Sequence, residues 1–212
     1  RDRRIGILGG SFDPVHNAHI SLAESAAKQL GLDLVIFMPA RCAALKDGPP
    51  SATCQQRVEM LKIALQSVKF PYEISDIEIK RDGISYSIDT VRELIKKYPD
   101  AEIYWIIGSD RLQKLSKWRD IGEFCKLAKF ACARRGGFAG DFSDAPKCAR
   151  IEPIDFDPID ISSTSLRRSL KNGDTRNLDI SPNVLDYILK NKLYICCLLY
   201  TSPSPRDAHE SR

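Results

Sequence analysis

Short apolar runs alternate along the chain with longer segments in which apolar positions recur at helical spacing. Apolar or alternating runs bounded by turn residues are typical of strands, and a period of 3.6 residues is typical of helices that cover a sheet. Strands are predicted at residues 4–9, 32–39, 72–81, 101–108, 128–137 and 149–154. Helices are predicted at residues 17–31, 51–68, 87–99, 162–173 and 181–192. This alternation predicts βαβ units and therefore parallel strand pairing.

Turn and capping residues mark the ends of several of these helices. Gly31 stands where a left-handed residue closes the first helix, and Pro99 stops the third. Thr53 and Gln56 have the spacing of a capping box at the start of the second. That second helix carries four apolar side chains on one face: Val58, Leu61, Leu65 and Val68. We therefore expect an α/β fold, a Rossmann-like doubly wound parallel sheet with a small helical C-terminal piece.

The composition is that of a globular protein and argues against several function classes. Of the 212 residues, 43% are hydrophobic and 28% are charged, and the net charge is +4. Because no stripe of Lys and Arg accompanies that charge, we expect no nucleic-acid partner. The seven cysteines match neither a disulfide framework nor a CxxC metal site, so we expect reduced thiols, no protein-held metal and a cytoplasmic location. The sequence contains no secretory signal and no bilayer-length apolar run, so we expect no membrane association.

Residues 1–194 are expected to form one domain, because neither a repeat nor a long linker divides them. The last stretch, "TSPSPRDAHESR", is rich in Ser, Pro and Arg and lacks the apolar side chains of a packed element. It resembles the translation of adaptor DNA. We therefore expect residues 195–212 to be a disordered, non-native scar, with a native flexible tail as the alternative. Whether the chain forms a homo-oligomer is left open.

The stretch "GGSFDPVHNAH", residues 9–19, leaves the first strand and enters the first helix. Gly9 and Gly10 allow the backbone to come close to a bulky anion, because no Cβ intrudes. Ser11 and Phe12 then offer backbone amides to phosphate oxygens. His16 and His19 follow in the first helical turn, so both imidazoles project from one side and can donate to a phosphate. The alternative is a tight strand–helix turn with one capping and one core histidine. The combination within eleven residues favours a phosphate site.

Two later stretches carry further candidates. "ISSTSLRRSL", residues 161–170, begins a helix with hydroxyls and amides that can cap it or bind an anion: Ser162, Ser163 and Thr164. Arg167 lies near the same helix start and offers a bidentate fork to phosphate. In "YWIIGSDRLQKLSKW", Gly108 permits close approach of a ligand, and Asp110 can accept ribose hydroxyls or cap the next helix. Trp118 reads as a core or half-buried side chain.

Together these motifs resemble the nucleotidyltransferase superfamily that carries the HxGH motif. "GGSFDPVH" is similar to the bacterial nicotinate-nucleotide adenylyltransferases in particular, and "SSTSLR" resembles their second signature, SSTxIR. "GSD" with the later tryptophan is similar to their GaD…W block, and "SYSIDT" to SYTxDT. The sequence departs from the family at Ala18, where the family has glycine, and at Leu45, where it has histidine. The resemblance covers nearly all of residues 5–194.

The resemblance implies that ATP and nicotinate mononucleotide are the partners, with Mg²⁺ held by phosphate oxygens. The implied ATP-binding set is Gly9, Gly10, Ser11, Phe12, His16, His19, Gly108, Asp110, Ser162, Ser163, Thr164 and Arg167. The implied mononucleotide-binding set is Lys46, Ser85, Tyr86, Thr90, Asp110, Trp118 and Arg135, with Trp118 stacked on the pyridine ring and Arg135 near its carboxylate. His16, His19, Lys46 and Arg167 form the catalytic set. Arg57 matches an R-x-x-M-L pattern and is expected to anchor a loop.

The implied reaction is adenylyl transfer in NAD biosynthesis, which yields deamido-NAD and pyrophosphate. The attacking phosphate is already an anion, so catalysis reduces to alignment and charge neutralisation. One alternative is another adenylyl- or cytidylyltransferase of the superfamily, acting on phosphopantetheine or nicotinamide mononucleotide. A second is a nucleotide-binding module with impaired catalysis, which the departures at Ala18 and Leu45 suggest.

Overall fold

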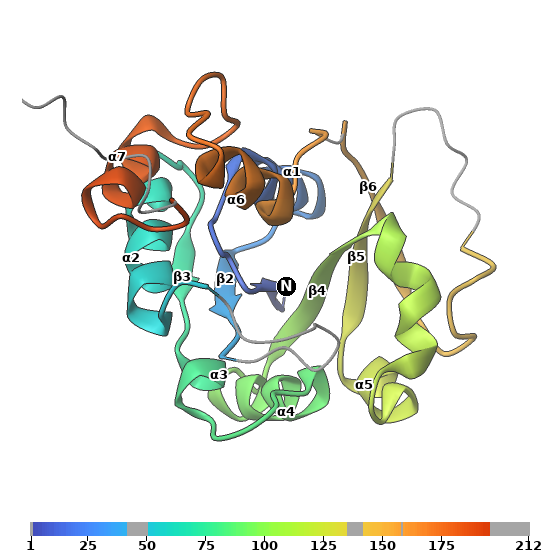
Figure 1. Cartoon of the computed structure of the whole chain (residues 1–212). Helices are drawn as coiled ribbons and strands as arrows, with labels where there is room; N and C mark the ends of the chain where they lie inside the picture. Colours follow the sequence, from blue (N-terminus) through green and yellow to red (C-terminus); the bar gives the residue numbers. More distant parts are fainter. Residues whose placement is uncertain (1, 42–50, 135–141, 158, 196–212) are drawn as a thin grey trace, which may run out of the picture.

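The computed structural model describes residues 2–41, 51–134, 142–157 and 159–195. These residues form a six-stranded sheet in the order β3-β2-β1-β4-β5-β6, in which every strand pair is parallel (Figure 1). The strands are β1 (Arg3–Gly10), β2 (Leu34–Pro39), β3 (Tyr72–Ile74), β4 (Ala101–Gly108), β5 (Lys129–Arg134) and β6 (Ile151–Asp155). The winding reverses between β1 and β4, so the fold is the expected Rossmann-like, doubly wound α/β fold.

Helices cover both faces of the sheet because successive side chains of a strand point to opposite sides. In β1, Leu8 joins one buried cluster, whereas Ile5 and Ile7 join the other. The first cluster includes side chains of α1 (Asn17–Leu30), α2 (Cys54–Leu65), α6 (Ser163–Lys171) and α7 (Pro182–Lys190). The second includes side chains of α4 (Ser87–Lys97), the 3₁₀-helix η1 (Ser109–Lys117) and α5 (Ile121–Leu127). The α6 and α7 pair forms the small helical piece expected at the C-terminal side.

The predicted helix ends are confirmed where capping chemistry is strong. Gly31 adopts φ +58° at the end of α1, and its N–H bonds to the carbonyl of Ala27. Thr53 and Gln56 form the expected capping box, with reciprocal backbone-to-side-chain distances of 3.0 and 3.2 Å. The helix itself ends at Leu65, so Val68 lies beyond it and packs half-buried against the core.

The prediction of a strand over residues 72–81 is wrong beyond the first three residues. β3 pairs only with Val35–Phe37 of β2, and the Ser75 N–H makes the last bond of this edge, to the Phe37 carbonyl. The chain then turns into the short helix α3 (Ile77–Lys80), which brings Ile77 onto the second cluster and buries Glu78. An alternating pattern fits both an edge strand and a short helix that buries every other residue, so periodicity did not separate them.

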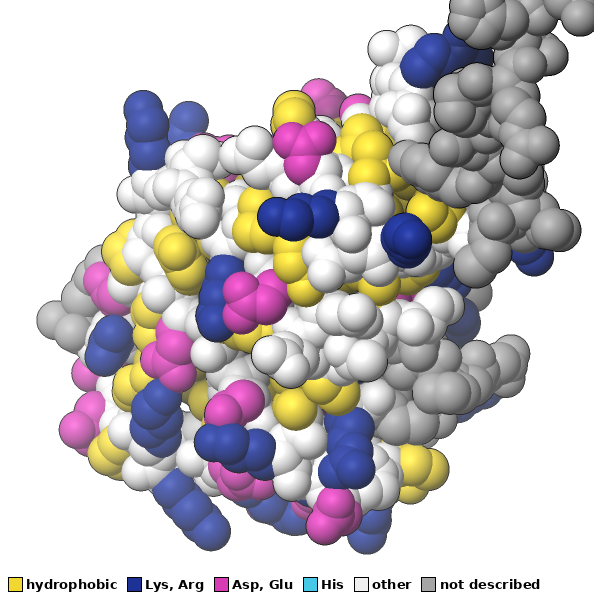
Figure 2. Space-filling model, turned by 60° about the vertical axis from the view of Figure 1, so that its left-hand side comes forward, with side chains coloured by type: hydrophobic (Ala, Val, Ile, Leu, Met, Phe, Trp, Pro, Cys, Tyr) yellow, Lys and Arg dark blue, Asp and Glu magenta, His cyan; other side chains and the backbone are white. Residues whose placement is uncertain are grey.

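The surface charge, the described helices and the described cysteines are relevant to the expectations about nucleic acid, membrane and disulfides. On the face drawn in Figure 2, Lys and Arg side chains are interspersed with Asp and Glu, and no continuous basic stripe crosses it. None of the described helices combines the length and apolarity that crossing a bilayer requires. Within the described residues, Cys54, Cys125, Cys132 and Cys148 are free thiols.

Candidate active site

The loop after β1 carries the first motif and is anchored from below by a buried arginine. Phe12 adopts φ +49° and turns its ring into the core, 6.1 Å from the ring of Phe37. Arg57 of α2 is only 1% exposed and donates from Nη1 to the carbonyls of Ser11, at 2.6 Å, and Ala40, at 2.7 Å. These bonds join the ends of β1 and β2, which is the loop-anchoring role expected of Arg57.

The side chain of Asp13 connects this loop to two other parts of the chain. Its buried carboxylate accepts hydrogen bonds from the Ser51 and Ala52 amides, at 2.8 and 3.0 Å, and from the Tyr194 hydroxyl, at 2.6 Å. Burial and the bond to Asp13 raise the pKa of Tyr194. The phenol therefore stays protonated and serves as a permanent donor. The loop is thereby fixed against the start of α2 and the segment after α7.

The start of α6 lies directly against the same loop. The Ser162 hydroxyl accepts the Ser165 N–H at 3.0 Å and caps the helix. The Ser163 hydroxyl donates to the Pro14 carbonyl at 2.9 Å, and Arg167 Nη1 donates to the Asp13 carbonyl at 2.8 Å. Two motifs that are about 150 residues apart in the sequence are therefore joined by direct hydrogen bonds.

His16 and His19 form a stacked pair at the start of α1. Their ring centroids are 3.7 Å apart with an interplanar angle of 22°, and Phe12 packs edge-on against His19 at 5.0 Å. The His16 backbone N–H donates to His19 Nδ1 at 3.2 Å. In the neutral imidazole this bond assigns the proton of His19 to Nε2, which leaves that nitrogen as a donor. Burial lowers the pKa of His16 to about 4, so this ring is neutral at physiological pH.

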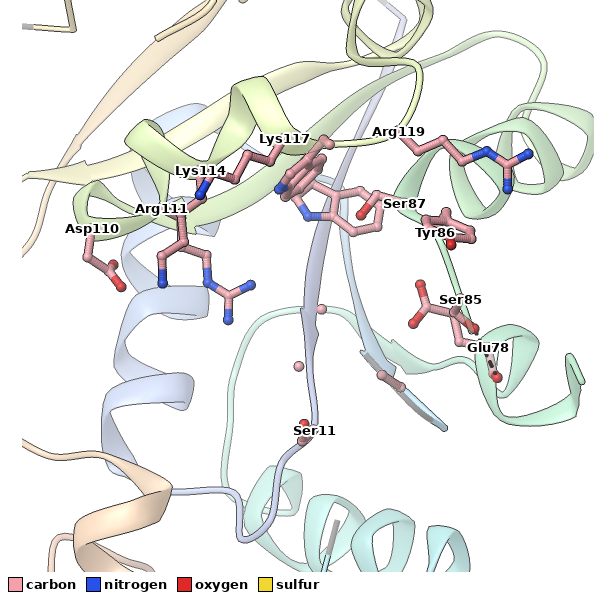
Figure 3. Close-up of a pocket in the computed structure, with 15 residues that line it drawn as sticks. Ser11, Glu78, Ser85, Tyr86, Ser87, Asp110, Arg111, Lys114, Lys117 and Arg119 are labelled. Carbon is pink, nitrogen blue, oxygen red and sulfur yellow. Dashed lines mark hydrogen bonds between the residues drawn. The ribbon is translucent and has the colours of Figure 1, made fainter. Parts of the chain in front are cut away.

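Two cavities adjoin at the carboxyl edge of the central strands, beside the point where the sheet reverses. One, of about 490 Å³, is lined by Gly9, Gly10, Ser11, Ala40, Glu78, Ser85, Tyr86, Ser87, Trp105, Asp110, Arg111, Lys114, Lys117, Trp118 and Arg119 (Figure 3). The other, of about 730 Å³, is lined by His16, Ala18, His19, Leu22, Gly108, Ser109, Asp110, Arg111, Ala133, Arg134, Phe156, Ile161, Ser162, Ser163, Thr164 and Arg167. We call them the first and the second cavity. Asp110 and Arg111 line both.

The predicted site residues are distributed between these cavities. The second cavity gathers eight of the predicted ATP set: His16, His19, Gly108, Asp110, Ser162, Ser163, Thr164 and Arg167. Three others, Gly9, Gly10 and Ser11, line the first cavity instead, together with Ser85, Tyr86, Asp110 and Trp118 of the predicted mononucleotide set. Phe12 lines neither cavity, because its side chain belongs to the core. Lys46 and Arg135 lie outside the described residues.

Thr90 is fully buried behind the first cavity and does not line it. Its hydroxyl donates to Glu78 Oε1 at 2.8 Å, and Arg81 Nη1 donates to the same hydroxyl at 3.1 Å. Burial raises the pKa of Glu78, while the bond from Thr90 and the charge of Arg81 lower it in part. Thr90 therefore supports a buried carboxyl group that faces the cavity.

Several lining residues were not identified from the sequence: Glu78, Arg111, Lys114, Lys117 and Arg119. Glu78 was hidden by the incorrect strand prediction. The cations of η1 follow a period of three residues, which belongs to a 3₁₀-helix and which a search for periods of 2 and 3.6 does not detect.

Trp118 is held by an aromatic cluster below the first cavity. Its ring meets the rings of Trp105, Phe124 and Phe130 at centroid distances of 6.1, 5.4 and 5.8 Å, all with edge-to-face geometry. Edge contacts of this kind fix the orientation of an indole ring. One part of Trp118 therefore remains available to the cavity in a defined orientation.

Comparisons with known proteins agree with this arrangement. A family model described as cytidylyltransferase-like matches residues 7–169. A probable nicotinate-nucleotide adenylyltransferase of Streptococcus pyogenes serotype M1 is 37% identical over 192 residues, which are 91% of this chain and 89% of the relative. One of Bacillus licheniformis is also 37% identical, over 91% of this chain and 98% of the relative. The chain belongs to the nicotinate-nucleotide adenylyltransferase family. The resemblance found in its motifs is confirmed.

Solved structures share the fold of this nicotinate-nucleotide adenylyltransferase family member. A Plasmodium falciparum nicotinic acid mononucleotide adenylyltransferase matches with TM-scores of 0.73 in its complex with NaAD and 0.74 in its complex with APC. Both matches have 23% sequence identity and cover 91% of this chain and 97% of the other. At this identity the likeness concerns the fold, and it agrees with the doubly wound sheet.

The burial of His16 predicts that the protein loses stability in mild acid. Its pKa is about 4 in the folded chain and 6.5 when unperturbed, so the unfolded chain binds the extra proton first as the pH falls. The contribution of His16 to the free energy of unfolding therefore has its full value above pH 6.5. It declines between pH 6.5 and 4 by about 3 kcal/mol. Urea unfolding across this range measures the decline.

The control for this prediction is His16→Gln, which has no titrating ring. The free energy of unfolding of this variant should fall less between pH 6.5 and 4 than that of the wild-type protein. An NMR titration that gives His16 an ordinary pKa in the folded protein would contradict the prediction.

Proposed function

We propose that the protein transfers the adenylyl group of ATP to the 5′-phosphate of nicotinate mononucleotide, forming deamido-NAD and pyrophosphate. The observation that carries this proposal is the pair of adjoining cavities that share Asp110 and Arg111. The second combines the two histidines with the start of α6, and the first combines an oriented indole with polar side chains. Such a pair suits two anionic substrates that must meet at one point.

The chemistry needs positioning more than proton transfer. An oxygen of the mononucleotide phosphate attacks the α-phosphorus of ATP, a new P–O bond forms, and the bond from that phosphorus to the β-phosphate bridging oxygen breaks. Pyrophosphate leaves with the electron pair of that bond. The nucleophile is already deprotonated at neutral pH, so alignment and stabilisation of the developing charge supply the catalysis.

In this proposal the second cavity binds the triphosphate. His19 Nε2 and the neutral ring of His16 donate to phosphate oxygens, since neutral imidazoles each carry one N–H. The amides at the start of α6 and the Thr164 hydroxyl bind the β- and γ-phosphates, helped by the positive end of the helix dipole. Arg167 Nη1 and Nη2 bond to the Asp13 carbonyl and the Thr164 hydroxyl, so its guanidinium is held in place while it faces the cavity.

The first cavity in turn binds the mononucleotide. The pyridine ring stacks on Trp118, whose orientation the cluster with Trp105 and Phe124 maintains. Ser85 and Tyr86 line the same cavity, across from Asp110 and Arg111 (Figure 3). Asp110 accepts ribose hydroxyls, because it lies where both nucleotides approach. On the family resemblance of the sequence, we also propose that Lys46 contacts the phosphate of the mononucleotide and that Arg135 contacts its pyridine carboxylate.

Mg²⁺ enters this scheme with ATP, and it lowers the negative charge of the triphosphate. In the described part of the chain no cluster of three or more His, Cys, Asp or Glu side chains gathers that could hold a metal. Asp110 is the carboxylate that lines both cavities. An ion that keeps phosphate oxygens and waters as its main ligands fits these walls. We place the reaction in the cytoplasm, which is consistent with the free thiols of the described residues.

The test is a pyrophosphate-release assay with ATP, Mg²⁺ and one acceptor at a time. We expect release with nicotinate mononucleotide well above that with nicotinamide mononucleotide or phosphopantetheine. Release with phosphopantetheine alone would indicate another transferase of the superfamily. Binding of ATP in calorimetry without release for any acceptor would indicate a binding module, and either result would refute the proposal.

His19→Ala is expected to lower kcat about 10²–10³-fold, because it removes a donor to charge that develops in the transition state. The matched variant His19→Gln keeps a side-chain N–H and should lose less. Thermal unfolding of both variants checks that the fold is intact. Near-normal turnover of a folded His19→Ala protein would remove this histidine from the mechanism.

Ala18 lines the second cavity, at the position where the family has glycine. Its methyl group occupies space at the nucleotide, so Ala18→Gly should lower the KM for ATP about threefold, roughly the effect of one methyl-sized group. The KM for the mononucleotide should not change. An unchanged or higher KM for ATP would show that the methyl does not obstruct the nucleotide.

A further inference from the structure

The wall of the first cavity contributed by η1 has an unusual regularity. η1 is a 3₁₀-helix of nine residues, Ser109–Lys117, whereas such helices rarely exceed three or four. A 3₁₀-helix has three residues per turn, so side chains three positions apart stand directly above one another. Any property repeated every three residues in this segment therefore forms a straight row along the helix.

Two such rows are present. Leu112 and Leu115 are buried in the core, and Trp118 continues this row at the half-buried end. One position earlier in each turn stand Arg111, Lys114 and Lys117, which are exposed and line the first cavity. We call these three residues the η1 cation row. The apolar row fixes the rotation of the helix, and this rotation presents the cation row to the cavity.

The η1 cation row has no partner among the residues that the structure describes. Within the described residues, none of its three side chains makes a hydrogen bond or an ion pair. Other cations of the two cavities are engaged: Arg119 stacks on Tyr86 at 4.8 Å, and Arg134 pairs with Asp155 at 2.8 Å. Three adjacent positive charges repel one another, and an anionic ligand relieves this repulsion.

Arg111 occupies a special place in the row. Lys114 and Lys117 line only the first cavity, whereas Arg111 lines both. Figure 3 shows Asp110, Arg111, Lys114 and Lys117 together on one side of the first cavity, across from Ser85 and Tyr86. The junction of the cavities is the point where, under the proposed function, the attacking phosphate meets the α-phosphate of ATP.

We propose that Arg111 binds the 5′-phosphate of the acceptor mononucleotide and holds it toward the second cavity. This inference rests on the proposed function. A guanidinium presents two parallel N–H donors that match two phosphate oxygens, and it orients the group as well as neutralising it. The ATP side already has Arg167, the histidines and the α6 start, whereas Arg111 is the cation that the described acceptor cavity offers at the junction.

The test compares Arg111→Gln with the matched variant Lys114→Gln. Both remove one positive charge from the same row, but only Arg111 reaches the junction. Arg111→Gln should raise the KM for nicotinate mononucleotide about tenfold to a hundredfold, as expected for loss of a charge-assisted bidentate contact. The KM for ATP should change less than about threefold. Lys114→Gln should produce a clearly smaller rise, and Arg111→Lys an intermediate one.

Binding is measured separately from turnover, by quenching of tryptophan fluorescence with nicotinate mononucleotide alone. Wild-type protein should bind it, and Arg111→Gln should weaken binding by the same factor as the KM. Equal effects of Arg111→Gln and Lys114→Gln would show that the row acts only through its summed positive charge. This result would overturn the inference. So would a rise confined to the KM for ATP, which would assign Arg111 to the triphosphate.

The two proposals can fail independently. If the wild-type protein turns over nicotinate mononucleotide and Arg111→Gln behaves normally, the inference fails while the function stands. If binding of the mononucleotide depends on Arg111 but no pyrophosphate is released, the function fails while the inference stands. Absence of both binding and release in the wild-type protein refutes both.

Discussion

The site depends on the contact between the loop after β1 and the start of α6. Ser163 donates to the Pro14 carbonyl and Arg167 to the Asp13 carbonyl, at 2.9 and 2.8 Å. Both bonds use backbone acceptors of the loop, so they set the position of its backbone directly. They bring the stacked histidines and the capped helix start to one cavity. Without them, the loop after β1 and the start of α6, which are about 150 residues apart, would have no fixed relation.

The sheet supplies the second constraint. Because β1 and β4 are neighbours while the chain winds away from them in opposite directions, a crevice opens at their carboxyl ends. Gly10 ends one of these strands and Gly108 the other. The two cavities divide this crevice, and Asp110 and Arg111, which directly follow β4, lie between them. The strand order therefore determines where the two substrates would meet.

Local chemistry explains what was predictable from the sequence. Gly31 and the Thr53–Gln56 capping box have short-range signatures, and their structures follow the sequence closely. The structure of the segment after Ile74 differs from the prediction, because its alternation of apolar and polar residues suits an edge strand and a short helix equally. Glu78 and Arg111 were missed since their importance arises from tertiary placement, one by burial against Thr90 and the other by the rotation of η1.

Under the proposed function the two cavities offer different groups to an anion, and this difference follows from burial. Burial keeps the pKa of His16 near 4, so the imidazole that lines the second cavity is neutral at physiological pH. In the proposed reaction this neutral donor stabilises charge as it develops, beside the fixed cation Arg167 of the same cavity. The η1 cation row is exposed, where a positive charge costs little desolvation. The exposed cation row of the first cavity, and the neutral imidazole that lines the second cavity together with Arg167, are thus consequences of where each side chain lies in the fold.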